Sequence, residues 1–351
     1  MTIKPGAFRF NTDSMKLEIF RGSANYNGTA SMAGIGTLAA GQWEEIQATS
    51  PEVQTGGTRG LIFPGYGGAG FNDTIEYINL DSTGNSIDFG NLSESRFNVG
   101  ASASRTRGIM MGGENSPGPR SDVIDFVTIA STGNATDFGN LIAGTVYPAG
   151  LSNSTRGISA GGATPSNIDV IQFVTIASTG NAVDFGNIGT GERQRAGACA
   201  TSTRGIIAGG ASPGRINSIE FITIATQGNS ADFGDLTEVC QNVQGCSNSV
   251  RGLFNGRIDS PGAITNTIDY ITIATLGNAI DFGDMTLRRR GCGAMASPTR
   301  GVFSCGNKHP SGTSEVIDYV QIMTTGDAID FGDTTFSAGD GSALSNGHGG
   351  L

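Results

Sequence analysis

The sequence predicts an all-β protein assembled from repeats of one four-stranded unit. A TRG motif or close variant recurs at intervals of 47 to 49 residues, and a DFG motif, preceded by TGN or a variant, follows the same period. The 56 glycines and the charged fraction of 15% are typical of many tight turns and not of helices. The TRG motif begins at Thr58, Thr106, Thr155, Thr203, Val250 and Thr299.

One period contains four strand-like stretches. Within residues 193–236 they are 196–200, 205–208, 219–225 and 230–236, of which the third is a β-branched run typical of strands. Four short strands in a unit of about 40 to 50 residues indicate a blade of a β-propeller. The repeat therefore predicts a single β-propeller of four-stranded blades.

The order of features within each period resembles the kelch repeat. An Arg-led strand precedes a strand that ends in Gly-Gly, an aromatic strand and a fourth strand with one large aromatic residue. The resemblance covers most of the chain and implies kelch-like blades, although Phe replaces the kelch Trp. These residues are Phe89, Phe138, Phe185, Phe233, Phe282 and Phe331.

The two ends of the chain predict how the ring closes. Trp43 aligns with the blade Phe, residues 16–20 resemble a third strand, and residues 343–351 resemble a first strand leading into a second. We expect seven blades, with residues 1–50 and 337–351 together completing the closing blade and residues 51–336 forming six kelch-like repeats. The alternative is six blades, with residues 1–50 as a small β module that resembles N-terminal modules of bacteriophage tail fibres.

Composition excludes several classes of partner. The net charge of −10 disfavours nucleic acid, and no stretch has the roughly 20 apolar residues that membrane insertion requires. Five scattered cysteines form a poor disulfide framework and favour folding in a reducing cytosol.

Residues present in every period predict structure before function, because each copy must pack against its neighbours. We therefore expect the Phe series and Trp43 to pack within and between blades. For the Arg of each TRG motif we expect a bidentate pair with an acidic residue such as the DFG Asp, the alternative being a solvated turn residue. This Arg series comprises Arg59, Arg107, Arg156, Arg204, Arg251 and Arg300.

Variation between periods predicts the binding surface. The turns between strands one and two and between strands three and four are nearly identical in every copy, so one face should be uniform. The opposite face receives the variable connections between strands two and three and the links between blades, and loops on a rigid scaffold often carry binding residues. Candidate binding residues there are Arg120, Arg193, Arg195, Arg215, Arg257, Arg288, Arg289, Arg290, Lys308 and His309.

Catalysis is not expected. His309 and His348 have no spacing for a metal or a triad and are expected to be solvated, and the cysteines are expected to be small buried side chains. The DFG motif lacks the other kinase motifs. We expect no catalytic residue, metal or cofactor.

The expected function is a non-catalytic structural or adhesion protein of a virus particle, since the Gly-rich propeller resembles such proteins of bacteriophage tails and capsids. Partners would be other virion proteins or a host-surface receptor or glycan, with a symmetric assembly left open. Localisation would be the virion, assembled in the host cytoplasm. The alternative is a cytoplasmic kelch-type module that binds a partner protein.

Overall fold

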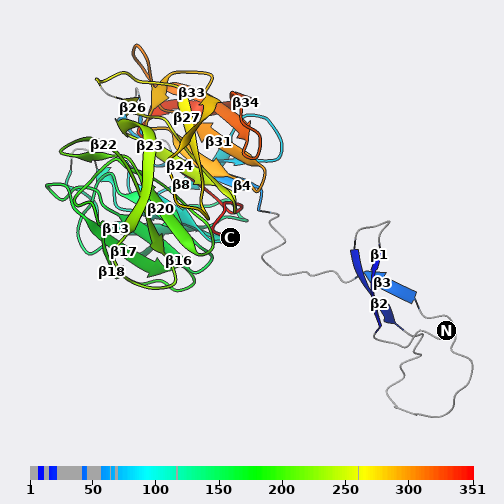
Figure 1. Ribbon diagram of the computed structural model, residues 1–351. Helices are drawn as coiled ribbons and strands as arrows, with labels where there is room; N and C mark the ends of the chain where they lie inside the picture. The colour runs from blue at the N-terminus through cyan, green and yellow to red at the C-terminus, as the bar shows by residue number, and fades with distance from the viewer. Residues whose placement is uncertain are drawn as a thin grey trace, which may run out of the picture. The chain divides into compact units, whose positions relative to one another are not determined.

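The computed structural model describes residues 7–11, 16–21, 42–45, 57–63, 65–67, 70–115, 118–259 and 261–351 (Figure 1). The chain forms two compact units, Met1–Gln54 and Thr55–Leu351. The first contains one antiparallel sheet in the order β1–β2–β3, where β1 spans Phe8–Asn11, β2 Lys16–Arg21 and β3 Gln42–Glu45.

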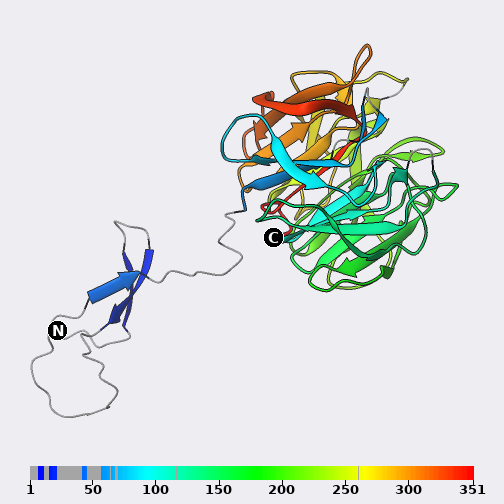
Figure 2. The ribbon, with the colours of Figure 1, turned by 180° about the vertical axis from the view of Figure 1, so that it is seen from behind.

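The second unit is a β-propeller of six four-stranded antiparallel blades, seen from opposite sides in Figures 1 and 2. The described residues contain no helix, so the all-β prediction is confirmed. The first strands of successive blades lie side by side and close a circle, in which the first strand of the last blade contacts that of the first.

Blade 1 is the blade that contains both the first and the last described strands of the propeller, and the other blades are numbered in chain order. Blade 1 consists of β35 (Ser342–Ser345), β4 (Arg59–Phe63), β7 (Thr74–Asn79) and β8 (Ile87–Asn91). Blade 2 consists of β10 (Gly100–Ala103), β11 (Arg107–Met111), β13 (Val123–Thr128) and β14 (Thr136–Asn140). Blade 3 consists of β15 (Ala149–Ser152), β16 (Arg156–Ala160), β17 (Val170–Thr175) and β18 (Val183–Asn187).

The remaining three blades follow in chain order. Blade 4 consists of β19 (Gly197–Ala200), β20 (Arg204–Ala208), β22 (Gly214–Thr223) and β23 (Ala231–Gln241). Blade 5 consists of β24 (Gln244–Ser247), β25 (Arg251–Asn255), β27 (Thr267–Thr272) and β28 (Ile280–Asp284). Blade 6 consists of β30 (Gly293–Ala296), β31 (Arg300–Ser304), β33 (Ser314–Gln321) and β34 (Ile329–Gly339).

The seventh blade expected from the two chain ends is not confirmed. The C-terminal strand β35 pairs with β4, from Ser342 opposite Phe63 to Ser345 opposite Gly60, and so completes blade 1. Residues 346–351 form no second strand, because β4 already occupies that place. β2 and β3 do pair as a third and a fourth strand do, but their sheet continues to β1. Trp43 therefore lies outside the blade sheets.

The DFG motif marks a β-bulge on the fourth strand of every blade. In blade 2, Asp125 pairs with Asp137 and Ile124 pairs with Gly139, so Phe138 is the extra residue. Each DFG Phe is buried and meets the aromatic residue of the third strand edge to face, with ring centroids 5.8–6.3 Å apart. The predicted packing role of the Phe series is confirmed.

Each DFG motif also receives the TGN turn of the next blade. The glycine N–H of the turn donates to the DFG Phe carbonyl at 2.7–2.9 Å in all six places, including Gly84 to Phe331 across the closure. The approach is so close that a Cβ on Gly139 would lie 2.4 Å from the carbonyl oxygen of Gly180. Glycine is required there by its neighbour and by its φ of 147°.

The TRG arginines join neighbouring blades and do not pair with the DFG Asp. Each Nη1 donates at 2.6–3.1 Å to a carbonyl just after the third strand of the next blade, and each guanidinium lies 4.6–4.9 Å from the aromatic ring of its own third strand. The predicted ion pair is wrong because the DFG Asp is exposed in every blade. The solvated-turn alternative is also wrong, since these side chains are half-buried and bonded. The acceptors of Arg59, Arg107, Arg156, Arg204, Arg251 and Arg300 are Ile129, Ile176, Ile224, Ile273, Ile322 and Leu80.

A second pattern repeats only in alternate blades. The first strand ends in Ser-Asn in blades 1, 3 and 5 and in Ala followed by Ser or Thr in blades 2, 4 and 6. Ser152 Oγ bonds both the N–H and the C=O of Ala103 in the preceding blade, while Asn153 Nδ2 donates to Ser202 O in the next. The same three bonds recur at Ser247-Asn248 and at Ser345-Asn346, so the ring is built of three two-blade units.

Replacement of Arg204 with Ala tests the connection between blades. The variant loses a charged hydrogen bond and a cation–π contact, so its free energy of unfolding should fall by about 2 kcal/mol in urea denaturation. The control Asp232→Ala removes an exposed DFG carboxylate and should change stability by less than about 0.5 kcal/mol. Equal stability of Arg204→Ala and the wild type would show that this contact contributes nothing.

Candidate functional site

The face that carries the variable loops is held together by hydrogen bonds in all six blades. The link that enters each blade runs beside the loop between its second and third strands. In blades 3 and 4 the pairing is a single bridge, at Val146–Ala163 and Gln194–Ala211. In blade 2, β9 (Arg96–Phe97) pairs with β12 (Glu114–Asn115), and in blade 6, β29 (Arg289–Arg290) pairs with β32 (Asn307–Lys308). In blade 5 the end of β23 pairs with β26 (Ile258–Asp259). In blade 1 the end of β34 pairs with β5 (Tyr66–Gly67), and β5 also pairs with β6 (Gly70–Phe71).

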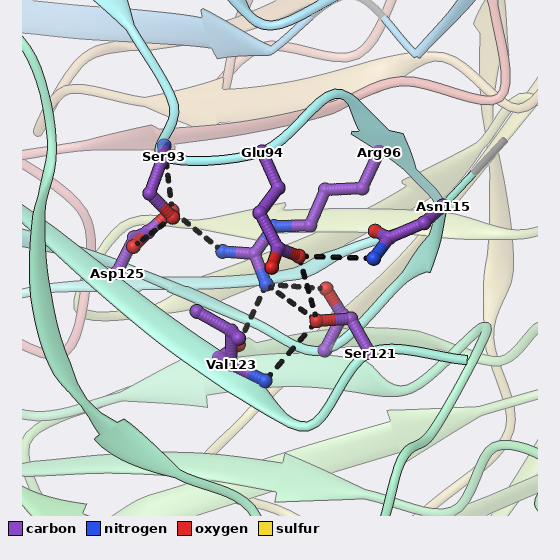
Figure 3. A network of polar contacts seen from close by, with 8 residues as sticks. Ser93, Glu94, Arg96, Asn115, Ser121, Val123 and Asp125 are labelled. Atoms are coloured by element: carbon purple, nitrogen blue, oxygen red, sulfur yellow. Dashed lines mark hydrogen bonds and ion pairs between the residues drawn. The ribbon is translucent and has the colours of Figure 1, made fainter. Parts of the chain in front are cut away.

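A buried arginine supports this face in blades 2, 4 and 6. Figure 3 shows the guanidinium of Arg96 between Asp125 and the chain at Ser121 and Val123. Its Nη2 lies 2.8 Å from Asp125 Oδ2, and its Nη1 donates to the carbonyls of Val123 at 2.6 Å and Gly112 at 3.0 Å. Ser93 Oγ donates to the same carboxylate at 2.7 Å. One cation thus joins the link, the second strand and the third strand.

Three of the predicted binding residues have this internal role. Arg193 pairs with Glu220 at 2.7 Å and Arg289 with Asp318 at 2.9 Å, and both arginines are at most 1% exposed. In blade 5, Cys240 stands at the link position, and Arg257 reaches Asp269 from the loop instead. The three side chains do not reach the surface, because the link in blades 4 and 6 and the loop in blade 5 turn them under the blade to meet the third-strand acid.

Blades 1 and 3 have Ala338 and Thr145 in place of the link arginine, and only blade 3 also replaces the third-strand acid. Blade 3 has Gln172 at this position, and its amide oxygen accepts the N–H of Ile142 at 2.9 Å. Blade 1 keeps the buried Glu76, which accepts hydrogen bonds from the hydroxyls of Ser86 and Thr335. Because an unpaired buried charge is costly, the neutral Gln172 relieves blade 3 of the need for a cation.

Burial and pairing oppose each other in the pKa values of these groups. Burial lowers the pKa of Arg96 below its ordinary value, against the charges of Asp125 and Glu94, which raise it. Burial raises the pKa of Glu220, but hydrogen bonds from Ser230 and Thr190 and the charge of Arg193 outweigh it, so that the pKa lies below its ordinary value. The network therefore favours the ionised carboxylate.

The other seven predicted residues are at least partly accessible. Arg288, Lys308 and His309 are exposed and lie together, since Lys308 pairs with Arg289 and the N–H of His309 donates to Arg288 O at 2.9 Å. Arg290 pairs with Asp340 at 3.2 Å. The half-buried residues are Arg120, Arg195 and Arg215; Arg120 Nη2 donates to Pro165 O at 3.2 Å, and Arg195 lies over the ring of Tyr147 at 4.2 Å.

At the centre of this face, six residues form a ring that we call the channel mouth. Each lies two residues before a first strand and has a φ between 54° and 62°. Neighbours are joined through the backbone, as where the N–H of Tyr147 donates to Asn98 O at 3.3 Å. For a residue other than glycine this conformation costs about 1–2 kcal/mol. The six are Asn98, Tyr147, Arg195, Asn242, Gly291 and Asp340.

Residues 346–351 lie at the other end of the first strands. His348 Nε2 lies 3.0 Å from Ala103 O, while the N–H of Gly350 donates to His348 Nδ1 at 3.1 Å. These two partners require the neutral imidazole with its proton on Nε2. Burial, with a smaller effect from Arg105, lowers the pKa of His348 to about 4. The expectation that His348 is solvated is wrong, because the tail folds back onto the first strands; His309 is exposed as predicted.

The five cysteines are buried, as predicted. Burial raises the pKa of Cys199, Cys240 and Cys305 to about 12 and that of Cys292 to about 11, so these thiols are protonated at neutral pH. Within the described ranges, no three His, Cys, Asp or Glu side chains are grouped as metal ligands, and no helix is long and apolar enough to cross a membrane.

Comparison with known proteins identifies no relative. No family model matches the chain, and no curated protein matches it significantly. The propeller fold therefore rests on the structure, and the resemblance to kelch repeats and to bacteriophage virion proteins has no support from family relationships.

The buried pairs and the channel mouth were not predicted from the sequence. The third-strand acid had a visible signal, since Glu, Asp or Gln precedes the aromatic residue in all six periods. A polar residue repeated inside an apolar strand indicates a buried partner. The mouth had no comparable signal, because its six residues share a backbone conformation and no chemistry.

Replacement of Arg289 with Thr should destabilise the protein by about 3–5 kcal/mol in chemical denaturation, because Asp318 stays buried without its cation. The control is Arg289→Thr with Asp318→Gln, which transfers the Thr145 and Gln172 of blade 3 to blade 6. The double variant should recover about 2 kcal/mol or more of the loss. A single variant that is as stable as the double variant would contradict a role for the charge pair.

The pKa of His348 predicts a loss of stability in mild acid. Between pH 6.5 and about 4 the unfolded state binds a proton at this residue that the folded state excludes, so stability falls as the pH falls. At about 1.4 kcal/mol per pH unit, the loss amounts to about 3 kcal/mol. Denaturation over this range should show a shallower slope for His348→Gln than for the wild type. The exposed-site control His309→Gln should keep the wild-type slope, and equal slopes for all three proteins would refute the assignment.

Proposed function

We propose that the protein is a non-catalytic structural or adhesion protein of a virus particle, and that it binds protein or glycan partners through the variable-loop face of the propeller. The observation that carries the proposal is the contrast between the two faces. On one face the TGN turns bond the preceding blade and the TRG arginines bond the next blade, in the same way six times. The other face holds loops of differing sequence on a rigid support.

Rigidity of this face favours binding. Its links and loops are already joined by ladders and by buried ion pairs, so they lose little conformational entropy when a partner docks. Arg288 and Lys308, which lie beside the exposed His309, place two cations on the surface of a chain whose net charge is −10. Such a group favours an acidic patch on a protein partner or an anionic group on a glycan.

Blocking each face in turn tests the proposal. The native cysteines are buried, so maleimide-polyethylene glycol should label only an introduced thiol. Glu192→Cys places the label on an exposed variable-face link, and Ser178→Cys places it in an exposed turn of the uniform face. Binding to glycan arrays and to bacterial cell surfaces should be lost after labelling at position 192 and kept after labelling at position 178.

The converse result, or equal loss at both positions, would contradict the assignment of the binding face. Absence of binding to either surface would contradict adhesion. Mass spectrometry of particles of the virus that encodes the chain should detect the protein in stoichiometric amounts, and its absence from them would contradict a virion role.

A further inference from the structure

The channel mouth keeps side chains where glycine fits the backbone better. Gly291 occupies one of the six left-handed positions with a φ of 59°, and the other five hold a larger residue in spite of the strain. The fold does not require a side chain at these five positions, since the backbone forms the same turn at Gly291, which has none. Side chains retained against backbone strain point to a use at that place.

These residues surround a cavity of about 50 Å³ at the end of the central channel. Its walls include Asn98, Tyr147, Arg195 and Asn242, and the Ala and Gly residues of the first strands narrow it below, as at Ala101 and Gly245. The cavity has room for about three or four water-sized groups. It takes one edge of a small ligand and not a folded segment of a protein.

Three polar atoms of the wall residues have no hydrogen-bond partner among the residues that the structure describes. Asn242 is only 4% exposed, and its Oδ1 is buried without a donor. Asn98 Nδ2 and Arg195 Nε are likewise buried without acceptors. The guanidinium of Arg195 is held over Tyr147 at 4.2 Å, so its position is fixed before a ligand arrives. The residues that line the cavity thus leave one acceptor and two donors unpaired.

This set distinguishes between classes of ligand. A carboxylate accepts hydrogen bonds from Asn98 and Arg195 but leaves Asn242 Oδ1 unsatisfied, and an ammonium group is repelled by Arg195. A hydroxyl both donates and accepts, so two neighbouring hydroxyls satisfy all three atoms. We infer that the channel mouth binds a pair of adjacent hydroxyls on a neutral sugar, the terminal residue of a glycan. The inference rests on the proposed use of the variable-loop face and specifies its ligand.

The experiment uses the full chain and neutral methyl glycosides of glucose, galactose and mannose. Saturation-transfer NMR and calorimetry should detect binding of at least one of them, with affinity reduced about tenfold or more in Arg195→Gly and in Asn242→Ala. The control is Asp232→Ala, which removes the exposed carboxylate of a DFG motif, away from the channel mouth. It should bind within about twofold of the wild type.

Stability separates loss of binding from loss of fold. Glycine adopts the left-handed conformation readily, so Arg195→Gly should unfold close to the wild-type midpoint, as should the control Asp232→Ala. A variant that binds no sugar while melting as the wild type does supports the site. Wild-type binding by both Arg195→Gly and Asn242→Ala would place the ligand elsewhere and overturn the inference.

Two further outcomes would contradict the sugar assignment or the proposed binding face. No binding of any glycoside at the highest soluble concentration, or binding of acetate or an acidic peptide in their place, would overturn the sugar assignment while leaving the face-blocking experiment to judge the proposed function. If sugars bind and the label at position 178 blocks them while the label at position 192 does not, both proposals fail together.

Discussion

Closure of the ring is the constraint on which the rest of the structure depends. One strand, β35, pairs with β4 and makes a blade from the two ends of the propeller sequence. With that blade in place, each contact between neighbours occurs six times without an end: the glycine N–H to the Phe carbonyl, and the TRG arginine to the following blade. An open array has two outer blades that lack these bonds, whereas a circle has none.

Within this circle the chain is organised as three pairs of blades. Ser-Asn ends the first strand in blades 1, 3 and 5, and the link arginine lies under blades 2, 4 and 6. The two features lie at opposite ends of the first strands and alternate with each other. Blade 5 departs from the pattern, since its acid Asp269 is paired by Arg257 from the loop. Blade 5 thus keeps the ion pair with an arginine from another position. This indicates that the buried acid requires a cation and that the position of the arginine is secondary.

The sequence predicted what depends on local pattern, namely the period, the four strands of a blade, the buried Phe series and the two unlike faces. It did not predict what depends on a partner far along the chain. The hairpin of β2 and β3 has the local pattern of a third and fourth strand, and pattern does not reveal that β1 continues the sheet. Arg204 bonds a carbonyl 69 residues away. Arg193 and Arg289 were expected at the surface because charged residues in links usually lie there.

The two faces differ in how their polar atoms are bonded. On the uniform face the TGN amides, the side chains of residues such as Asn153 and the imidazole of His348 form hydrogen bonds within the protein. At the channel mouth the opposite holds, since Asn98, Arg195 and Asn242 keep buried polar atoms without partners. Folding alone does not select unsatisfied polar atoms on strained residues. These three residues all lie two positions before a first strand, which is where the proposed sugar would supply the missing hydrogen-bond partners.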